Sequence, residues 1–266
     1  MKAPPPFTVV YEDGNIIAVS KASGIPVGGD RWDTDRQRLD RLVAACLRPD
    51  PSGGDTPKLF IVHRIDQDTS GLVVFAKHAA AHRRLSLAFE GRDVTKRYIA
   101  VVCGRPLWEE TICDLPLIPN GNKQHLTIID KYRGKKSLTR FKLLGSAGNY
   151  SVLEALPETG RTHQIRVHAA ALGFPVACDP LYGRVSQARD KPVLLSTIKK
   201  SWRGDPHEEK PLLARLGLHA AELSLPAWDT GENPIKLHAP LPRDMAALVR
   251  QMEKTASCAI FFKNNG

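Results

Sequence analysis

The chain has 266 residues, of which 42% are hydrophobic and 25% are charged, so it can bury a substantial core and is not disordered as a whole. Lys and Arg together number 38 against 28 Asp and Glu, which leaves a formal net charge of +10 and indicates a polyanionic partner. No apolar run is long enough to cross a bilayer, and the opening residues MKAPPPF lack the apolar core of a signal peptide, so we expect a soluble protein without membrane association.

The first third of the chain predicts a hairpin, a helix and a loop between buried strands. Residues 7–11 and 15–21 have strand-like composition and are joined at Asp13-Gly14, a dipeptide suited to a tight turn. Apolar residues then recur at helical spacing over residues 34–47, before the loop sequence RPDPSGGDTP. The β-rich runs LFIVH and GLVVFAK follow, so residues 64–70 are expected in a loop held between two strands.

Helices and strands alternate through the rest of the chain. Apolar spacing predicts a helix around Ala81 to Phe89, KRYIAVVCG predicts a strand, and SLTRFKLLG with NYSVLEALP predicts a hairpin. A helix follows, with Thr159 as its expected cap and Gly173 as its stop, and LPRDMAALVRQM predicts a last helix. Residues 186–210 are charged and aperiodic, and we expect a long loop or insertion there.

The absence of a repeat or of a clear linker predicts one domain rather than two. We expect an α+β fold on a mixed, mostly antiparallel sheet flanked by helices and loops. The domain should span residues 7–255, with residues 1–6 and 256–266 as terminal tails.

Five cysteines are scattered, odd in number and without a CxxC pair, so neither a disulfide framework nor a zinc site is indicated. They are Cys46, Cys103, Cys113, Cys178 and Cys258. We expect reduced thiols and a cytoplasmic location.

Asp66 is a candidate for chemistry because it lies in the expected loop between Arg64 and Asp68. A carboxylate near a cation can stay ionised, as a nucleophile or a general base must. Local chemistry alone favours another role, a turn in which Asp, Thr and Ser side chains bond their own backbone. The HRID sequence is also similar to the HRD loop of protein kinases, but an extra residue separates Arg from Asp, and the chain has neither a phosphate-covering GxGxxG nor a DFG element.

A second set of polar residues, in TGRTHQIRVH, lies at the expected start of a helix, where arginines and backbone N–H groups make an anion site. A metal site is excluded by the spacing of His163 and His168, and each histidine alone is expected to be a hydrogen-bonding structural residue. Arg166 could instead turn toward a carboxylate from another segment and lower its pKa. Tyr98, on a strand, would by itself be packing material.

Together these motifs resemble a known family. HRIDQDTSGLVVFAK is similar to the signature of the RluA family of pseudouridine synthases, usually written HRLDxxTSGLLxxAK. The resemblance continues in order through the opening strands VVYEDGNIIAVSKASGIPV, the tyrosine motif KRYIAVVCG and the arginine motif TGRTHQIRVHAAALGFPVACDPLYG. The closing sequences LHAAELSLP and LHAPLPRDM complete it, so nearly the whole chain is covered.

The resemblance implies an RNA isomerase that detaches uracil from its N1 glycosidic bond, rotates it and rejoins it through C5 without a cofactor or a metal. Asp66 becomes the catalytic aspartate, Tyr98 assists proton transfer at C5, and Arg166 pairs with Asp66. Arg64 takes the space of the flipped base, and Leu218 packs under the base. Three further residues of the motifs are assigned to substrate binding: Thr69, Arg161 and His163.

The RNA partner is expected to be ribosomal or transfer RNA, bound by a monomer that needs no protein partner. The likeness begins at Phe7, so we expect no N-terminal S4-type domain, and RNA contacts must come from the catalytic domain. The basic run of residues 123–142, with Asp130 as its one acid, is the expected phosphate surface. Its assigned residues are Lys123, Lys131, Arg133, Lys135 and Lys136, and a later loop adds Lys199, Lys200 and Arg203.

Three positions depart from the family pattern: Ala22 stands in place of the proline of NKP, Gly28 in place of a frequent histidine, and Cys178 in place of a glycine. Two other functions stay open. One is a catalytically silent RNA-binding or RNA-chaperone protein of the same fold. The other is a carboxylate glycosidase or nucleosidase acting on a small molecule.

Overall fold

The computed structural model describes residues 5–29, 37–47, 58–122, 126–183, 191–228 and 233–256. The chain forms two compact units. The first takes the chain up to Lys96 together with Ala220–Pro240, and the second takes Arg97–His219 and the chain from Leu241 onward. The chain passes between the units three times: within β5 (Thr95–Cys103), within β11 (Leu218–Leu225) and between Pro240 and Leu241.

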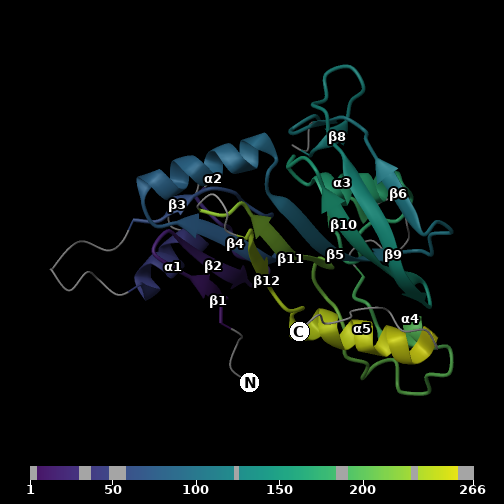
Figure 1. Cartoon of the computed structure of the whole chain (residues 1–266). Coiled ribbons are helices and arrows are strands. Elements are labelled where there is room, and N and C mark those ends of the chain that lie inside the picture. Colours follow the sequence, from purple (N-terminus) through teal and green to yellow (C-terminus); the bar gives the residue numbers. More distant parts are fainter. Residues whose placement is uncertain are drawn as a thin grey trace. The chain divides into compact units, whose positions relative to one another are not determined.

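The first unit is a sheet covered by a helix. Its strands follow the order β1-β2-β4-β11, with β3 paired to β4 and β12 paired to β11. In Figure 1, α2 runs along β3 and β4, and its apolar residues Ala81, Leu85 and Ala88 join the core formed by the strands. The remaining bounds are β1 (Phe7–Glu12), β2 (Ile16–Lys21), α1 (Leu39–Cys46), β3 (Phe60–Ile61), β4 (Ser70–Ala76), α2 (Ala79–Gly91) and β12 (Ile235–His238).

The second unit is a sheet of order β5-β10-β9-β6, accompanied by the small hairpin β7-β8. Helix α3 supplies Ile165 and Ala169 to the core of this sheet, and α5 packs on β9 beside α4 (Figure 1). The bounds are β6 (Glu110–Cys113), β7 (Leu117–Ile118), β8 (Ile128–Ile129), β9 (Thr139–Ala147), β10 (Tyr150–Pro157), α3 (Gln164–Ala171), α4 (Leu195–Ile198) and α5 (Arg243–Ala256).

The strand and helix expectations are largely confirmed, because alternation and helical spacing were strong in both hairpins and in α2 and α5. Every strand pair whose register is recorded is antiparallel, in agreement with the expected mostly antiparallel sheet. No helix in the described ranges has the length and apolar character needed to cross a membrane. The four cysteines in those ranges are free thiols, and Cys258 lies outside them.

Two local expectations were wrong. Thr159 does not cap α3, which begins at Gln164 after His163 in a left-handed conformation with φ 53°. The Thr159 hydroxyl instead accepts the Leu138 N–H at 3.0 Å and donates to the Gln164 side chain at 2.7 Å, so tertiary partners replace the local cap. The segment 186–210, expected to be a loop, contains the short helix α4, and residues 186–190 lie outside the described ranges.

Gly71 allows β4 and β11 to come close together. Its φ is +113°, and a Cβ there would lie 2.2 Å from the carbonyl oxygen of Ala220. No L side chain fits this geometry, because both the backbone conformation and the space exclude it. The glycine of the HRIDQDTSGL motif is therefore required by strand packing.

We predict that Gly71→Ala lowers the free energy of unfolding by about 3 kcal/mol or more, because the new methyl group meets backbone that cannot move aside. Urea denaturation followed by circular dichroism measures this. Gly14→Ala is the matched control, since a Cβ at Gly14 meets nothing within 4 Å. Equal stability of the two variants would contradict the packing argument.

Candidate active site

The loop that carries Asp66 is held in place by hydrogen bonds to its main-chain carbonyls. The Thr69 N–H donates to the Asp66 carbonyl at 3.1 Å and closes a turn. The ammonium group of Lys21, whose side chain is buried, donates to the Gln67 carbonyl at 2.7 Å, and Gly24 N–H donates to the same oxygen at 2.9 Å. Ser23 Oγ donates to the Asp68 carbonyl at 2.7 Å. The turn is closed by main-chain groups. The loop is therefore compatible with Asp66 as a catalytic residue and with Asp66 as a turn residue.

His63 supports the same loop from the strand side. Its Nε2 accepts the Val74 N–H at 2.9 Å, and its ring stacks on Phe89 with centroids 4.7 Å apart. Burial, reinforced by the nearby charge of Lys96, lowers the pKa of His63 to about 3. The imidazole is therefore neutral at physiological pH and carries its proton on Nδ1. Sequence analysis assigned no role to His63 or Lys21.

The side chains of this loop differ in exposure. Arg64 is exposed, Asp66 is half-buried, and Thr69 is buried. The Thr69 hydroxyl has no hydrogen-bond partner among the described residues. A buried hydroxyl without a partner costs about 1–3 kcal/mol, so it is available to water or to a bound group.

Arg166 lies in the second unit, on α3, and forms a buried bidentate ion pair. Its Nε and Nη2 donate to the two carboxylate oxygens of Asp179, each at 2.8 Å, and both side chains are almost fully buried. The guanidinium carbon also lies 5.2 Å from the ring centroid of Tyr182. Asp179 was not singled out from the sequence, although it stands in the arginine motif. The expected pairing of Arg166 with Asp66, which belongs to the first unit, stays a prediction.

Tyr182 connects this ion pair to two neighbouring segments. Its hydroxyl is 2.8 Å from His163 Nδ1 and accepts the Thr127 N–H at 3.1 Å. Burial raises the pKa of Tyr182, so the phenol stays protonated. The phenol and the His163 ring thus share a hydrogen bond, and this bond keeps His163 at the start of α3.

His168 is the structural histidine that the sequence predicts. It is fully buried, and its ring nitrogens lie 3.0 Å from Thr139 Oγ1 and 3.0 Å from the Leu115 carbonyl. The carbonyl can only accept, so Nε2 carries the proton and Nδ1 accepts from Thr139. Gln164 donates to Thr139 at 2.9 Å and completes the network.

Tyr98 and Leu218 belong to one apolar cluster of the second unit. Leu218 is buried in it, as is Ile165, the residue that precedes Arg166, and Tyr98 packs against this cluster. Tyr98 on β5 lies opposite Ala155 on β10, and this register fixes the position of the tyrosine along the strand. The second unit thus contains three of the assigned residues: Tyr98, Arg166 and Leu218.

Known proteins share this arrangement of sequence and fold. A family model described as RNA pseudouridylate synthase matches residues 15–171, which contain Asp66, Tyr98 and Arg166. A Zymomonas mobilis protein named ribosomal large subunit pseudouridine synthase D is 32% identical over 248 residues, covering 93% of this chain and 73% of that protein. The chain belongs to the RluA family of RNA pseudouridine synthases.

Two further comparisons agree with this membership. An uncharacterized RNA pseudouridine synthase of Zymomonas mobilis is 34% identical over 237 residues, covering 88% of this chain and 94% of that protein. The structure of human RNA pseudouridylate synthase domain containing 1 has a TM-score of 0.68 at 26% identity and covers 91% of this chain and 87% of that one. Human RNA pseudouridylate synthase domain containing 4, at a TM-score of 0.70 and 21% identity, shows the shared fold.

The expected enzyme class and fold are therefore confirmed: the synthase is an α+β isomerase that acts on RNA. Nothing in the comparisons favours the catalytically silent alternative. The alternative of a glycosidase that acts on a small molecule has no support in these relatives, which are named as pseudouridine synthases of RNA or of the ribosomal large subunit.

The basic surface of the synthase is partly neutralised by ion pairs. Arg133 donates from Nε to the Asp130 carboxylate at 2.9 Å, while Arg140 and Lys142 pair with glutamates. Lys131, Lys135 and Lys136 are exposed, and no ion pair is recorded for them among the described residues. Arg161 extends this surface toward α3, because its Nε lies 3.3 Å from the Lys136 carbonyl. Lys123, assigned to the same surface, lies outside the described ranges.

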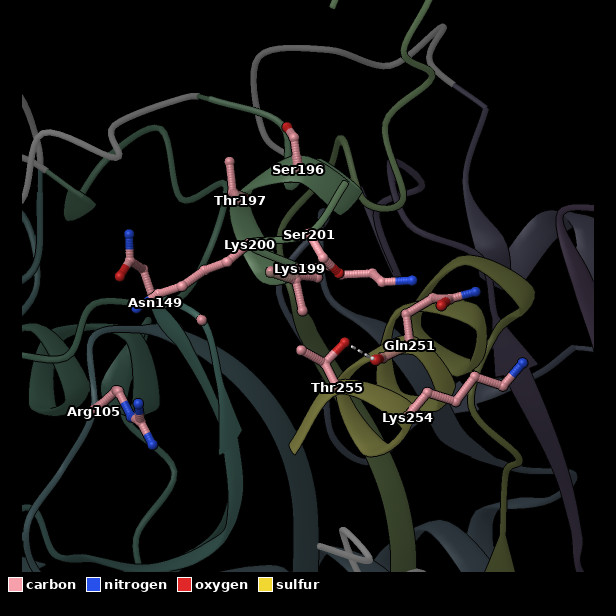
Figure 2. Close-up of a pocket in the computed structure, with 12 residues that line it drawn as sticks. Arg105, Asn149, Ser196, Thr197, Lys199, Lys200, Ser201, Gln251, Lys254 and Thr255 are labelled. Atoms are coloured by element: carbon pink, nitrogen blue, oxygen red, sulfur yellow. Dashed lines mark hydrogen bonds between the residues drawn. The ribbon is translucent and has the colours of Figure 1, made fainter. Parts of the chain in front are cut away.

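Figure 2 shows a second basic site, a cavity of about 870 Å³ in the second unit. Lys199 and Lys200, expected to contact RNA, line it together with Arg105 and Lys254. Hydroxyl and amide side chains form most of the remaining lining, with Gly148 and Ile198, and no carboxylate is among the lining residues. The Thr255 hydroxyl donates to the Gln251 carbonyl at 2.9 Å. Arg105 and Lys254 were not predicted from the sequence, since their proximity depends on tertiary contacts such as the one between α4 and α5.

We predict that protonation of His63 contributes to acid destabilisation. Its pKa is about 3 in the folded state and about 6.5 when unfolded, so the unfolded state takes up the proton first as the pH falls. The stability contributed by neutral His63 is complete above pH ~6.5 and is lost progressively toward pH ~3.

Urea midpoints between pH ~5 and ~7 measure the effect. His63→Gln should have a flatter pH dependence than wild type, whatever its absolute stability, because glutamine does not titrate. His207→Gln, at an exposed site, is the control and should keep the wild-type slope. Parallel curves for wild type and His63→Gln would refute the assignment.

Proposed function

We propose that Asp66 is the catalytic aspartate of this RNA pseudouridine synthase. The observation that supports the proposal most directly is the fixed loop, in which Lys21, Ser23 and Gly24 bind the main-chain carbonyls that follow the half-buried Asp66. A reactive group needs such positioning, because misplacement by a fraction of an ångström slows a reaction strongly.

In the proposed reaction the bond between ribose C1′ and uracil N1 breaks and a bond from C1′ to C5 forms. N1 gains a proton and C5 loses one, so the atoms balance and no oxidant or co-reactant is needed. Asp66 would act at the sugar or at the uracil ring, and Tyr98 would assist proton transfer at C5. Arg166 would hold Asp66 ionised by pairing with it.

We further propose that Arg64 fills the space left by the flipped uridine and that Leu218 packs under the base. The exposure of Arg64 and the burial of Leu218 support these roles. Thr69, Arg161 and His163 would bind the substrate, and the unpartnered hydroxyl of Thr69 supports its assignment.

The substrate is proposed to be ribosomal RNA of the large subunit. The support comes from relatives in Zymomonas mobilis and Pseudomonas aeruginosa that are named ribosomal large subunit pseudouridine synthase D. We expect the synthase to act as a cytoplasmic monomer without a protein partner. Phosphates would bind the exposed lysines 131, 135 and 136 and the cavity of Figure 2.

We predict that Asp66→Asn lowers pseudouridine formation by about 10³-fold or more, because the amide can neither attack nor accept a proton. Its affinity for RNA should stay within about twofold, since the isosteric change leaves the loop backbone in place. Asp68→Asn, in the same turn as Asp66, is the matched control and should remain active.

Carbodiimide-stop sequencing of ribosomal and transfer RNA, from cells complemented with each variant, measures the activity and names the substrate. Sites restored by wild type and Asp68→Asn, and not by Asp66→Asn, are expected in large-subunit ribosomal RNA. Sites in transfer RNA alone would overturn the substrate proposal, and full activity of Asp66→Asn would overturn the catalytic one.

We also predict that a Lys135→Ala, Lys136→Ala double variant binds RNA more weakly and with a smaller salt dependence. The slope of log affinity against log salt should fall by about 1–2, because each phosphate contact releases condensed counterions. Filter binding at several salt concentrations measures it. An unchanged slope would place the phosphate contacts elsewhere.

A further inference from the structure

Tyr132 is an exposed aromatic residue in the middle of the basic surface. Its side chain is 99% exposed, and it is the one aromatic among the large apolar side chains that remain exposed in the described ranges. Single exposed apolar residues are ordinary, so exposure alone does not assign a role. The turn that carries Tyr132 provides the further evidence.

That turn is rigidly built around Asp130. The Asp130 carboxylate accepts the N–H groups of Tyr132 at 3.0 Å and of Arg133 at 2.9 Å, and these bonds lower its pKa. The Gly134 N–H closes the turn on the Asp130 carbonyl at 2.9 Å. A Cβ at Gly134 would lie 2.3 Å from that carbonyl, so the turn requires glycine.

The turn is anchored to the rest of the second unit on two sides. Lys135 and Leu117 exchange two backbone hydrogen bonds, at 2.8 and 3.0 Å, which join the turn to the β7-β8 hairpin. Thr127, just before β8, donates to Tyr182, whose ring packs against Arg166. Through these contacts the turn is linked to the ion pair of the arginine motif.

The charge around Tyr132 selects the kind of partner. Lys131, Lys135 and Lys136 are exposed, and Asp130, the nearby acid, is engaged by Arg133. An aromatic ring between free cations fits a nucleic acid strand, because bases stack on the ring while phosphates meet the lysines. In a helical duplex the bases are already stacked and out of reach, so the ring needs an unpaired base.

We propose that Tyr132 is a stacking platform for an unpaired nucleotide of the RNA substrate, outside the site of the isomerised uridine. This inference rests on the proposed function and narrows its substrate class to RNA with single-stranded nucleotides near the target. Rigid presentation by Asp130 and Gly134 lowers the entropy lost when the base stacks.

The test compares Tyr132→Ala, Tyr132→Phe and Tyr132→Trp in the full chain. The probes are a fluorescein-labelled stem–loop with a uridine-containing single-stranded loop and a blunt duplex of equal length. Tyr132→Ala should weaken stem–loop binding roughly 5- to 100-fold, the range for loss of one base stack. Tyr132→Phe and Tyr132→Trp should bind like wild type, because both keep a ring.

Three controls separate stacking from other roles. Leu107→Ala removes another fully exposed side chain, at 101% exposure, and should not affect binding. Duplex binding and the salt slope should be the same for Tyr132→Ala and wild type, since no phosphate contact is lost. Measuring binding in the Asp66→Asn background tests the platform even if the catalytic proposal fails.

Wild-type stem–loop affinity in Tyr132→Ala would overturn the inference. An equal loss of affinity for the duplex would also overturn it, because the effect would then come from the placement of charge. A loss of affinity in Tyr132→Phe as large as in Tyr132→Ala would overturn it too, because the effect would then come from the hydroxyl group. A loss confined to the stem–loop and to the alanine variant supports it.

Discussion

The bidentate ion pair between Arg166 and Asp179 is the contact on which most of the second unit's site depends. Two buried charges are tolerated only as a pair with good geometry, and removing one partner leaves the other uncompensated at a cost of about 3–5 kcal/mol. Because Arg166 is also packed against Tyr182, the pair fixes His163 and Thr127, the residue just before β8. One electrostatic constraint thereby orders α3, the catalytic arginine we propose and the turn that carries Tyr132.

The first unit solves a different problem, the positioning of the Asp66 side chain on a loop. Its solution is a buried lysine. Lys21 sits on β2 among apolar neighbours, where its ammonium group must find acceptors, and it takes the Ala22 and Gln67 carbonyls. One carbonyl belongs to the segment just after β2, and the other belongs to the loop that carries Asp66. The cost of burying the charge is thus coupled to the order of the loop, and the neutral His63, just before the loop, accepts the Val74 N–H.

The basic residues of this synthase fall into two groups, those paired with acids of the chain and those left exposed to solvent. Some cations bind acids of the chain itself: Arg133 holds a turn, and Arg140 and Lys142 pair with glutamates beside β9. Others remain exposed near the arginine motif or line the cavity of Figure 2. Net charge alone does not distinguish these groups, and only the second kind can exchange condensed counterions for RNA phosphates. The count of 38 Lys and Arg therefore overstates the number of cations available to the substrate.

Sequence by itself determined the family, the order of strands and helices and the loop position of Asp66, because period-2 and period-3.6 patterns and the motifs are local along the chain. It did not determine that Lys21 binds a carbonyl 46 residues away, that Asp179 is a partner of Arg166, or that Thr159 bonds Leu138 instead of capping α3. Each of these depends on which segments the fold brings within about 3 Å, and hydrogen bonds between distant residues leave no periodic signal in the sequence. Only the tertiary structure decided them.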